Sequence, residues 1–316
     1  MTFASKTHLR RRWQLCLALL CCVCTTAVAA PANKKKHSVR KEPSVRAAER
    51  VERAERAERV ERAEPAEPAT LPGGVPNTLA ASVIVVDART GEVLYEKNAD
   101  AQRAVASTQK LLTALIVAER GYLDQRVTVA PIDTYAEPTK LGFKAGETYQ
   151  RLDLLRALLV HSCNDVARCL ARDTAGSIEN FAELMNQKAR SVGATNSQFM
   201  NPNGLPMPGQ YSTARDLSLI ARAAYANPTI RSIVSLPNLV FRYADGHTQT
   251  FDNTNKVLRR LPYCNGMKTG YTDAAGHCLI SSAARPGRDV ISVVLGDNKP
   301  RVWIDSAALL TWALQI

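Results

Sequence analysis

A serine and a lysine three positions apart stand at the head of a stretch with helical apolar spacing. They form the run Ser107-Thr108-Gln109-Lys110, and the pattern predicts a helix over residues 107–119. Residues three positions apart lie on one face of a helix, so the lysine amine can reach the serine hydroxyl. A serine hydroxyl is a weak nucleophile until a neighbouring base takes its proton. The pair therefore predicts a serine nucleophile with a lysine base, and the first helical turn offers amide groups to a developing oxyanion.

The same spacing also arises by chance. Residues 38–41 read Ser-Val-Arg-Lys, but they lie in a basic segment with no helical pattern around them, so they are not a candidate site. A four-residue pattern of this kind is weak by itself. Its interpretation depends on partners elsewhere in the chain.

Ser162-Cys163-Asn164 is a polar triplet between two segments that predict helices, residues 152–160 and 165–173. A hydroxyl at this place can pass a proton between a nucleophile, its base and a leaving nitrogen. The asparagine amide can both donate to and accept from a substrate backbone. Helix junctions often carry serine and asparagine as caps, so this triplet gains its meaning only from the others.

Lys268-Thr269-Gly270 lies in a segment that predicts a strand, and Tyr271 follows it. A lysine beside a hydroxyl suits a substrate carboxylate, and a glycine lets a substrate backbone approach the strand closely. The backbone N–H of Tyr271 can contribute to an oxyanion hole. A bare Lys-Thr-Gly is also a common turn, so this triplet too depends on the rest of the set.

The three elements occur in the order 107, 162 and 268, which is the combination found in penicillin-binding proteins and class A β-lactamases. Across about residues 78–316 the chain resembles the serine D-Ala-D-Ala carboxypeptidases, the low-molecular-mass penicillin-binding proteins. Other stretches that resemble this family are Asn203-Gly204-Leu205, residues 211–216, Asn253-Thr254-Asn255, residues 266–272 and Ala275-Gly276.

The resemblance implies roles for individual residues. Ser107 forms the acyl-enzyme, Lys110 is the general base and Ser162 relays protons. A lysine base must be neutral although its ordinary pKa is about 10.4, and partial burial together with a second cation, Lys268, would lower that pKa. No metal or cofactor is implied. The substrate-binding residues that the resemblance implies are Asn164, Lys268, Thr269, Gly270 and Tyr271.

The implied activity is that of a serine-type D-Ala-D-Ala carboxypeptidase acting on peptidoglycan stem peptides, with β-lactam antibiotics as covalent inhibitors. The chain resembles the short members of the family, which lack a C-terminal β domain. Some short members are endopeptidases, so a D,D-endopeptidase that cleaves cross-links is the alternative. Cys163 departs from the small, inert residue expected there, and Arg301 lies near the place of an arginine that helps to hold the substrate carboxylate in this family.

Four other classes fit the sequence less well. A Ser-His-Asp hydrolase lacks its Gly-x-Ser-x-Gly elbow, and His161 is interpreted as a loop or packing residue. A zinc peptidase lacks paired ligand spacing. A class A β-lactamase needs a deacylating glutamate in a Glu-x-x-Leu-Asn loop, and neither Glu179 nor Glu183 has that pattern. A non-catalytic wall-binding protein leaves the intact trio of motifs unexplained.

The positive charge of the chain is concentrated before the folded region. The formal net charge is +12, and more than half of the excess lies in the first 70 residues. No phosphate-binding loop or nucleic-acid motif occurs, so nucleic acid is not an expected partner. The basic tract instead suggests peripheral association with an anionic wall polymer or membrane surface.

Residues 1–29 predict a signal peptide, with a basic start, an uncharged run and the small-x-small pattern Ala27-Val28-Ala29. The mature protein is therefore expected outside the cytoplasm, in the periplasm or cell-wall space, and an uncleaved anchor is the alternative. Residues 30–76 predict a linker made of an Ala-Glu-Arg repeat, either a solvated helix or a disordered stalk, and a run rich in proline and glycine. We expect residues 31–75 to pack against nothing.

Residues 77–316 predict one α/β catalytic domain of the β-lactamase/penicillin-binding type. The expected fold is an antiparallel sheet of about five strands, flanked by helices, with an all-helical insertion; the first two strands and the last two share the sheet. Cys163, Cys169, Cys264 and Cys278 are interpreted as free thiols rather than bridges. Strands are expected over residues 82–87, 93–96, 276–283 and 290–296, around Lys268 and after Pro228, and further helices over residues 178–192, 214–226 and 300–316.

Overall fold

A computed structural model describes residues 66–316 of the chain. The predictions for residues 1–65, which concern the signal peptide, its cysteines and the charged repeat, lie outside the described residues. Within residues 66–316, no helix is long and apolar enough to cross a membrane.

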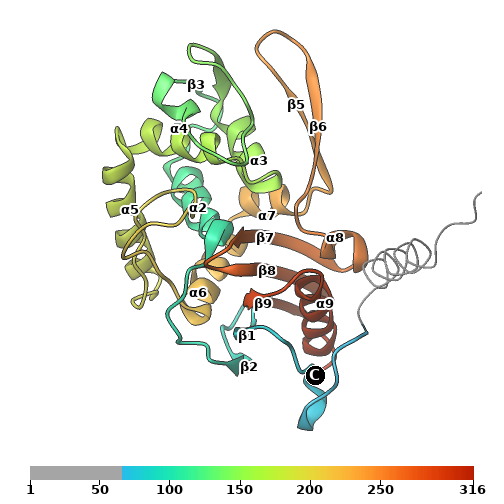
Figure 1. The fold of residues 1–316 in the computed structure, drawn as a ribbon. Coiled ribbons are helices and arrows are strands. Elements are labelled where there is room, and N and C mark those ends of the chain that lie inside the picture. The colour runs from blue at the N-terminus through green and yellow to red at the C-terminus, as the bar shows by residue number, and fades with distance from the viewer. Residues whose placement is uncertain (1–65) are drawn as a thin grey trace, which may run out of the picture. The chain divides into compact units, whose positions relative to one another are not determined.

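A five-stranded antiparallel sheet forms the centre of the domain, in the order β2-β1-β9-β8-β7 (Figure 1). It joins the first two strands of the described chain to the last two, as the sequence predicts, and adds β7 at its edge; this confirms the expected fold class. The strands are β1 (Ser82–Asp87), β2 (Val93–Lys97), β7 (Cys264–Thr272), β8 (Gly276–Arg285) and β9 (Arg288–Asp297).

Strand β1 shows why the sheet is covered on both faces. All six of its residues are buried, and successive side chains of a strand point to opposite faces. Val83 and Val85 join an apolar cluster with the terminal helix α9 (Arg301–Ala313), whereas Ile84 and Val86 join the larger cluster made with the other helices. The sheet is therefore the middle layer between α9 and the helical part of the domain (Figure 1).

The helices of the middle of the chain lie where the sequence predicts them. Thr213 accepts from the N–H of Asp216 at 3.0 Å and Ser177 accepts from that of Asn180 at 3.1 Å, so side-chain caps fix two helix starts. The helices are α2 (Lys110–Arg120), α3 (Arg151–Val160), α4 (Asn164–Ala175), α5 (Ile178–Ser191) and α6 (Ala214–Ala226).

Two expectations need correction. The insertion is mostly but not entirely helical, because β3 (Arg126–Thr128) and β4 (Thr148–Gln150) form a short antiparallel ladder within it. The stretch after Asn227 begins with a helix, α7 (Pro228–Val234), before it becomes strand-like. Asn227 accepts from two amides of that helix, and its proline occupies the first helical position, where no N–H is needed.

The remaining elements surround this framework. Strands β5 and β6 form a separate hairpin that projects from the domain beside the helices (Figure 1). Their bounds and those of the shorter elements are η1 (Pro72–Gly74), η2 (Ala106–Gln109), η3 (Pro131–Thr134), β5 (Asn238–Arg242), β6 (Thr248–Asp252) and α8 (Val257–Arg260).

The first described residues contact the domain, so the expectation that residues 31–75 pack against nothing is wrong for residues 66–75. The indole N–H of Trp312 donates to the carbonyl oxygen of Gly73 at 3.4 Å, and Glu67 forms an ion pair with Arg260 at 3.4 Å. The turn at Pro72–Gly74 thus presents the backbone carbonyl of Gly73 to the terminal helix. A composition rich in proline and glycine therefore does not exclude docking by main-chain groups.

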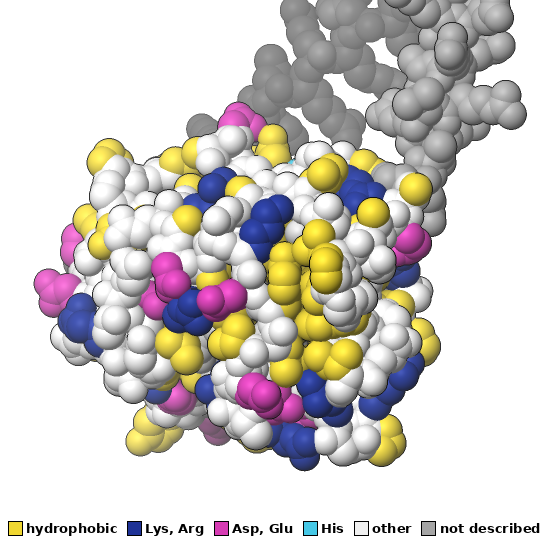
Figure 2. Space-filling view, turned by 90° about the horizontal axis from the view of Figure 1, so that it is seen from below, with side chains coloured by type: hydrophobic (Ala, Val, Ile, Leu, Met, Phe, Trp, Pro, Cys, Tyr) yellow, Lys and Arg dark blue, Asp and Glu magenta, His cyan; other side chains and the backbone are white. Residues whose placement is uncertain are grey.

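The face of the domain seen in Figure 2 has no large cluster of charged side chains of one sign. There basic and acidic side chains are interspersed, and hydrophobic side chains form one patch among them. In the interior, Cys163, Cys169, Cys264 and Cys278 are buried free thiols, which confirms the interpretation of these cysteines.

Candidate active site

Ser107 and Lys110 meet where the 3₁₀ turn η2 runs into helix α2. The Nζ atom of Lys110 lies 2.7 Å from the Oγ atom of Ser107. Lys110 is fully buried, and Ser107 is partly exposed. Ala106, just before the serine, has a positive φ of 48°, a strained backbone conformation of a kind that clusters at active sites. The turn thus holds a hydroxyl at the surface above a buried amine.

The amine of Lys110 has three oxygen neighbours at hydrogen-bond distance. Besides Ser107 Oγ, these are Asn164 Oδ1 at 2.7 Å and the backbone oxygen of Asn203 at 2.6 Å. Both of the latter are carbonyl oxygens, which accept but do not donate. These two oxygens accept the two N–H groups of a neutral amine, so the lone pair of the amine points toward Ser107 Oγ. The arrangement therefore suits a lysine that removes the serine proton.

The carbonyl of Asn203 belongs to a loop that the sequence did not assign to the site. Helix α2 holds this loop: the hydroxyl of Thr113 donates to Pro202 O at 2.7 Å. Gly204 has a φ of +83°, and a Cβ atom there would lie 2.1 Å from the carbonyl oxygen of Ala106. The only sequence signal for this contact was the likeness of Asn203-Gly204-Leu205 to the family, because the acceptor itself is a backbone atom.

Strand β7 approaches Ser107 from the other side. A Cβ atom on Gly270 would lie 2.8 Å from the amide nitrogen of Ser107 and 2.9 Å from that of Thr108. Glycine is therefore required where the strand passes the nucleophile. Tyr271 is 55% exposed, with its hydroxyl donating to Asp273 at 2.8 Å and its ring stacked on His277. The side chain of Tyr271 points to solvent, so this residue can contribute to an oxyanion hole only through its backbone N–H.

Two buried lysines shape the electrostatics of the site. Burial lowers the pKa of Lys268 from 10.5 to about 7, and its Nζ atom donates to Thr269 O at 3.0 Å. Burial, and next the nearby charge of Lys268, lower the pKa of Lys110 well below its ordinary value. Neither amine has a carboxylate partner at hydrogen-bond distance among the described residues. The site therefore favours a neutral Lys110 and leaves Lys268 ready to accept an anion.

Thr269 and the triplet Asn253-Thr254-Asn255 connect the strand to the helical part. The hydroxyl of Thr269 donates to Thr254 Oγ1 at 2.7 Å, and the N–H of Thr254 donates to Val160 O at the end of α3 at 3.1 Å. The side chain of Asn255 donates to Gly266 O at 2.7 Å. These bonds fix β7 against the helix that leads into Ser162-Cys163-Asn164.

Ser162 is close in sequence to Asn164, the acceptor for Lys110, but is not hydrogen-bonded to Ser107 or Lys110. It stands two residues before Asn164, and within residues 66–316 no hydrogen bond joins its hydroxyl to Ser107 or Lys110. It has a positive φ of 69°, which is uncommon for a residue with a side chain. The hydrogen bond of the proposed nucleophile and base is therefore formed between Ser107 and Lys110, and the role of Ser162 as a proton relay stays a prediction.

The neighbours of Ser162 do not compete for the chemistry. His161 packs against Phe251 with ring centroids 4.4 Å apart. Burial, and next the charge of Lys268, lower the pKa of His161, so its imidazole is a neutral packing group. Cys163 is buried, and that burial raises the pKa of its thiol, so the thiol is not ionised at neutral pH.

Arg301, the arginine considered for the substrate carboxylate, forms an ion pair with Asp305 at 2.7 Å, so its guanidinium is already held by a carboxylate.

Asp165 is a further positioning residue that sequence reasoning missed. Its carboxylate accepts from the amides of Leu141 and Gly142 at 3.0 and 2.9 Å. The amide of Asn164 in turn donates to Thr139 O at 2.7 Å. The segment before β4 is thereby tied to the start of α4, where the acceptor for Lys110 stands. In the described part of the chain, no three His, Cys, Asp or Glu side chains converge to hold a metal ion.

Comparison with known proteins gives a consistent family. A family described as D-alanyl-D-alanine carboxypeptidase matches residues 70–299. The D-alanyl-D-alanine carboxypeptidase DacB2 of Mycobacterium tuberculosis is 37% identical over 248 residues, which cover 77% of this chain and 84% of the relative. A D-alanyl-D-alanine endopeptidase of Escherichia coli is 32% identical over 245 residues, 75% of this chain and 78% of the relative.

Solved structures agree. The crystal structure of a D-alanyl-D-alanine carboxypeptidase from Mycobacterium tuberculosis superposes with a TM-score of 0.74 at 35% identity, and covers 80% of this chain and 97% of that one. Some relatives are longer: this chain spans 58% of DacF from Bacillus subtilis.

The burial of Lys268 predicts that removing its amine stabilises the fold in a pH-dependent way. Below pH 7 the Lys268 amine is protonated in both the folded and the unfolded protein, so folding bears the full free-energy cost of burying the charge. Above pH 7 only the unfolded chain keeps the proton, and the cost shrinks until about pH 10.4. We expect Lys268→Met to raise the free energy of unfolding by roughly 3–5 kcal/mol at pH 6 and by little at pH 10.

Urea unfolding at the two pH values measures this difference, with Lys144→Met as control because Lys144 is exposed. A loss of stability at pH 6, or a gain that is the same at both pH values, contradicts the account of Lys268.

Proposed function

The chain belongs to the D-alanyl-D-alanine carboxypeptidase family and is a serine-type D,D-peptidase; on that premise we propose that Ser107 is the residue acylated by the substrate. The observation that carries the proposal is the 2.7 Å contact between Ser107 Oγ and the buried amine of Lys110. A neutral lysine at this distance is a base within reach of the proton that it must remove.

Acylation proceeds in two proton transfers. Lys110 takes the proton of Ser107 while Oγ attacks the carbonyl carbon of the penultimate D-Ala, and the carbonyl oxygen becomes an oxyanion. The backbone N–H groups of Ser107 and Tyr271 stabilise it. The C–N bond then breaks, and the proton returns from the Lys110 ammonium to the leaving amine. The terminal D-Ala departs, and the acyl group remains on Ser107 as an ester.

Ser162 serves as the relay in the second transfer. Its place two residues before Asn164 supports this role, and the hydroxyl must turn toward Lys110 when substrate is bound. Catalytic hydrogen bonds are often long or unformed in a free enzyme and tighten in the complex. Water then attacks the ester while Lys110 accepts its proton. As the C–O bond to Ser107 breaks, the Lys110 ammonium returns that proton to Ser107 Oγ, and the shortened stem peptide leaves as a free acid.

The remaining site residues hold the substrate. Asn164 keeps one N–H and one lone pair of its amide for a peptide group, because Lys110 and Glu137 O occupy the others. Lys268 binds the terminal carboxylate, and the hydroxyl of Thr269 turns from Thr254 Oγ1 to donate to the same carboxylate when substrate is bound. That anion raises the pKa of Lys268, so the lysine is protonated when substrate is present. Gly270 lets the peptide lie along β7.

The site favours carboxypeptidase action. Lys268 is buried without a carboxylate partner, and a pentapeptide supplies one, because its terminal carboxylate lies next to the scissile bond. Endopeptidase action is the second candidate, and the 32% identity to the endopeptidase of Escherichia coli supports it. The same acyl-enzyme serves both reactions. They differ in the group that leaves, which is free D-Ala in one and a cross-linked stem peptide in the other. A β-lactam acylates Ser107 in either case.

The site of action follows from the substrate. Peptidoglycan lies outside the cytoplasm, and residues 1–29, with their signal-peptide pattern, supply the route of export. The mature chain then begins near Ala30, with residues 30–76 as a linker to a catalytic domain over residues 77–316. Its basic tract supports peripheral association with anionic wall or membrane surfaces.

Removal of the nucleophile or its base should abolish the activity. We expect Ser107→Ala to lower the rate of D-Ala release by at least roughly 10³-fold and to prevent covalent labelling by fluorescent penicillin. Lys110→Ala should lose roughly 10²- to 10⁴-fold, because the hydroxyl then has no base. Ser191→Ala, at an exposed serine, is the control. Labelling of Ser107→Ala at the wild-type rate would contradict the assignment.

The dependence of kcat/KM on pH should reflect the ionisation of both lysines, Lys110 and Lys268. We expect kcat/KM to rise as Lys110 loses its proton and to fall as Lys268 loses its own, with a pKa of about 7 in the free enzyme. Lys268→Arg keeps a cation at every pH, so its alkaline limb should move upward by at least about one unit. Initial rates from pH 5 to 10 measure this. An alkaline limb at the same pH in both proteins excludes Lys268 as its origin.

Product analysis distinguishes the two candidate reactions. Purified protein is incubated with a pentapeptide monomer and, separately, with a cross-linked dimer, and products are separated by chromatography. We expect free D-Ala from the monomer and an intact dimer, because Lys268 and Thr269 bind a free carboxylate. Cleaved dimers with untouched pentapeptide would make the enzyme an endopeptidase. Ser107→Ala shows which products depend on the site.

A further inference from the structure

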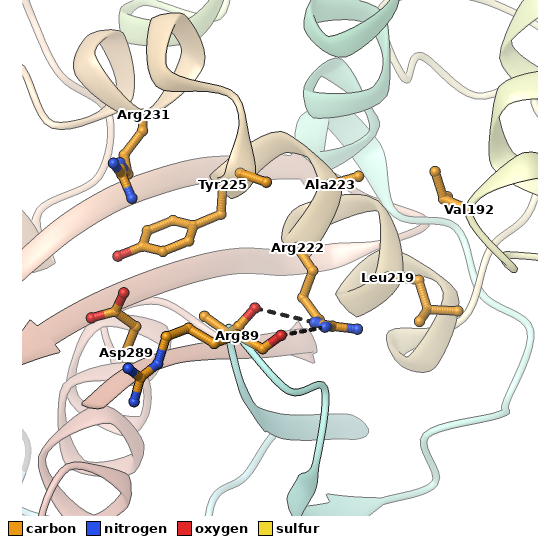
Figure 3. A pocket seen from close by; sticks show the side chains of 10 residues that line it. Arg89, Val192, Leu219, Arg222, Ala223, Tyr225, Arg231 and Asp289 are labelled. Carbon is orange, nitrogen blue, oxygen red and sulfur yellow. Dashed lines mark hydrogen bonds between the residues drawn. The ribbon is translucent and has the colours of Figure 1, made fainter. Parts of the chain in front are cut away.

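A second hollow with a polar rim lies apart from the Ser107 site. It has a volume of about 520 Å³, within the range of about 300–1,000 Å³ that small-molecule sites occupy. Helices α6 and α7 form one wall, and the turn after β1 and the start of β9 form the other (Figure 3). None of its lining residues belongs to the site described above.

Three arginines line this hollow, and they differ from other arginines of the domain. Arg151, for example, meets Asp173 at 2.9 Å. By contrast Arg89, Arg222 and Arg231 form no ion pair with a carboxylate within the part of the chain that the structure describes. Unpaired guanidinium groups gathered around one hollow attract an oxyanion, which their planar N–H groups can bind in pairs.

Arg222 is fixed at the centre of the hollow. Its Nε and Nη2 atoms donate to the carbonyl oxygens of Ala88 and Arg89 at 3.2 and 2.9 Å (Figure 3). A Cβ atom on Gly91 would lie 2.4 Å from its Nη1 atom, so the glycine turn closes over the guanidinium. The backbone thus immobilises the cation without neutralising it, and little side-chain freedom is lost when a ligand binds.

The other charges lie at the rim. Arg231 is exposed and lies over the ring of Tyr225, 5.4 Å from its centroid, and Arg89 is held through a hydrogen bond to Gly287 O. Asp289 is the only acidic residue in the lining. Three cations against one carboxylate leave the rim positively charged, which favours an anionic ligand.

The floor is apolar. Val192, Leu219 and Ala223 line it together with the ring of Tyr225. The hydroxyl of Tyr225 accepts from Asn265 of β7 at 3.0 Å and keeps its own proton for a further acceptor. The hollow is larger than an inorganic anion needs, and its floor offers contact area to carbon atoms. Its ligand therefore has an anionic group and an attached organic body.

We propose that this hollow binds an oxyanion, a carboxylate or a phosphate, carried on a larger organic molecule, with Arg222 and Arg231 as its main contacts. Two polymers found outside the cytoplasm present such groups: peptidoglycan, through the carboxylates of its stem peptides, and glycerol phosphate polymers, through their phosphates. The chemistry is the same for both. The site is independent of Ser107 and would hold the protein on its polymer while the peptidase site works.

Binding to protein whose Ser107 is blocked tests the proposal. Mature protein is treated with benzylpenicillin and titrated by calorimetry with a disaccharide tetrapeptide and, separately, with a glycerol phosphate oligomer. We expect at least one probe to bind, and Arg222→Gln and Arg231→Gln each to weaken its affinity by roughly tenfold or more. Whichever probe binds identifies the source of the oxyanion.

Arg242→Gln is the matched control, because Arg242 is exposed on the β5–β6 hairpin and the substitution removes the same charge. Because Arg222 also bonds the backbone, thermal unfolding checks its variant, and Arg231→Gln gives an independent result without those bonds. Absence of binding by both probes, or equal weakening by Arg242→Gln, overturns the proposal. D-Ala release by Ser107 is a separate readout, so failure of one assignment leaves the other measurable.

Discussion

Two lysine amines cannot both remain charged when they are buried close together and no carboxylate lies beside them. Lys110 and Lys268 are both fully buried, and burial together with the charge of Lys268 lowers the pKa of Lys110. A neutral amine next to a hydroxyl is a base, and a cation without a partner is a receptor for a carboxylate. The roles of nucleophile, base and anion site all follow from this one constraint, as does the cost in stability that burying the amines imposes.

The architecture of the domain serves this constraint. Lys110 begins a helix, Lys268 lies on a strand about 160 positions later, and the sheet that unites the two ends of the domain brings them together. Carbonyl oxygens, rather than carboxylates, surround the amine of Lys110, so that hydrogen bonds are satisfied without restoring its charge. The glycines at positions 204 and 270 let a loop and a strand approach the nucleophile from two sides.

The sequence predicted those parts of the structure that depend on side chains with a periodic pattern. Strand β1 and helix α6 were predicted to the residue, because a run of β-branched residues marks the first and helical apolar spacing marks the second. Helix α7 was missed because Asn227 and Pro228 suggest a break as readily as a helix start. The carbonyl of Asn203 was missed because a backbone acceptor leaves no mark in residue type. Whether Ser162 reaches Lys110 is a matter of rotation, which spacing cannot fix.

The most direct test of the account is the position of the covalent adduct that a β-lactam forms. The protein is treated with benzylpenicillin, digested, and its peptides are sequenced by mass spectrometry. If a neutral Lys110 activates the adjacent hydroxyl, one penicilloyl group per chain is found, on Ser107. An adduct on Ser162 or on any other residue, or no adduct on the folded protein, would contradict the assignment of the nucleophile and its base.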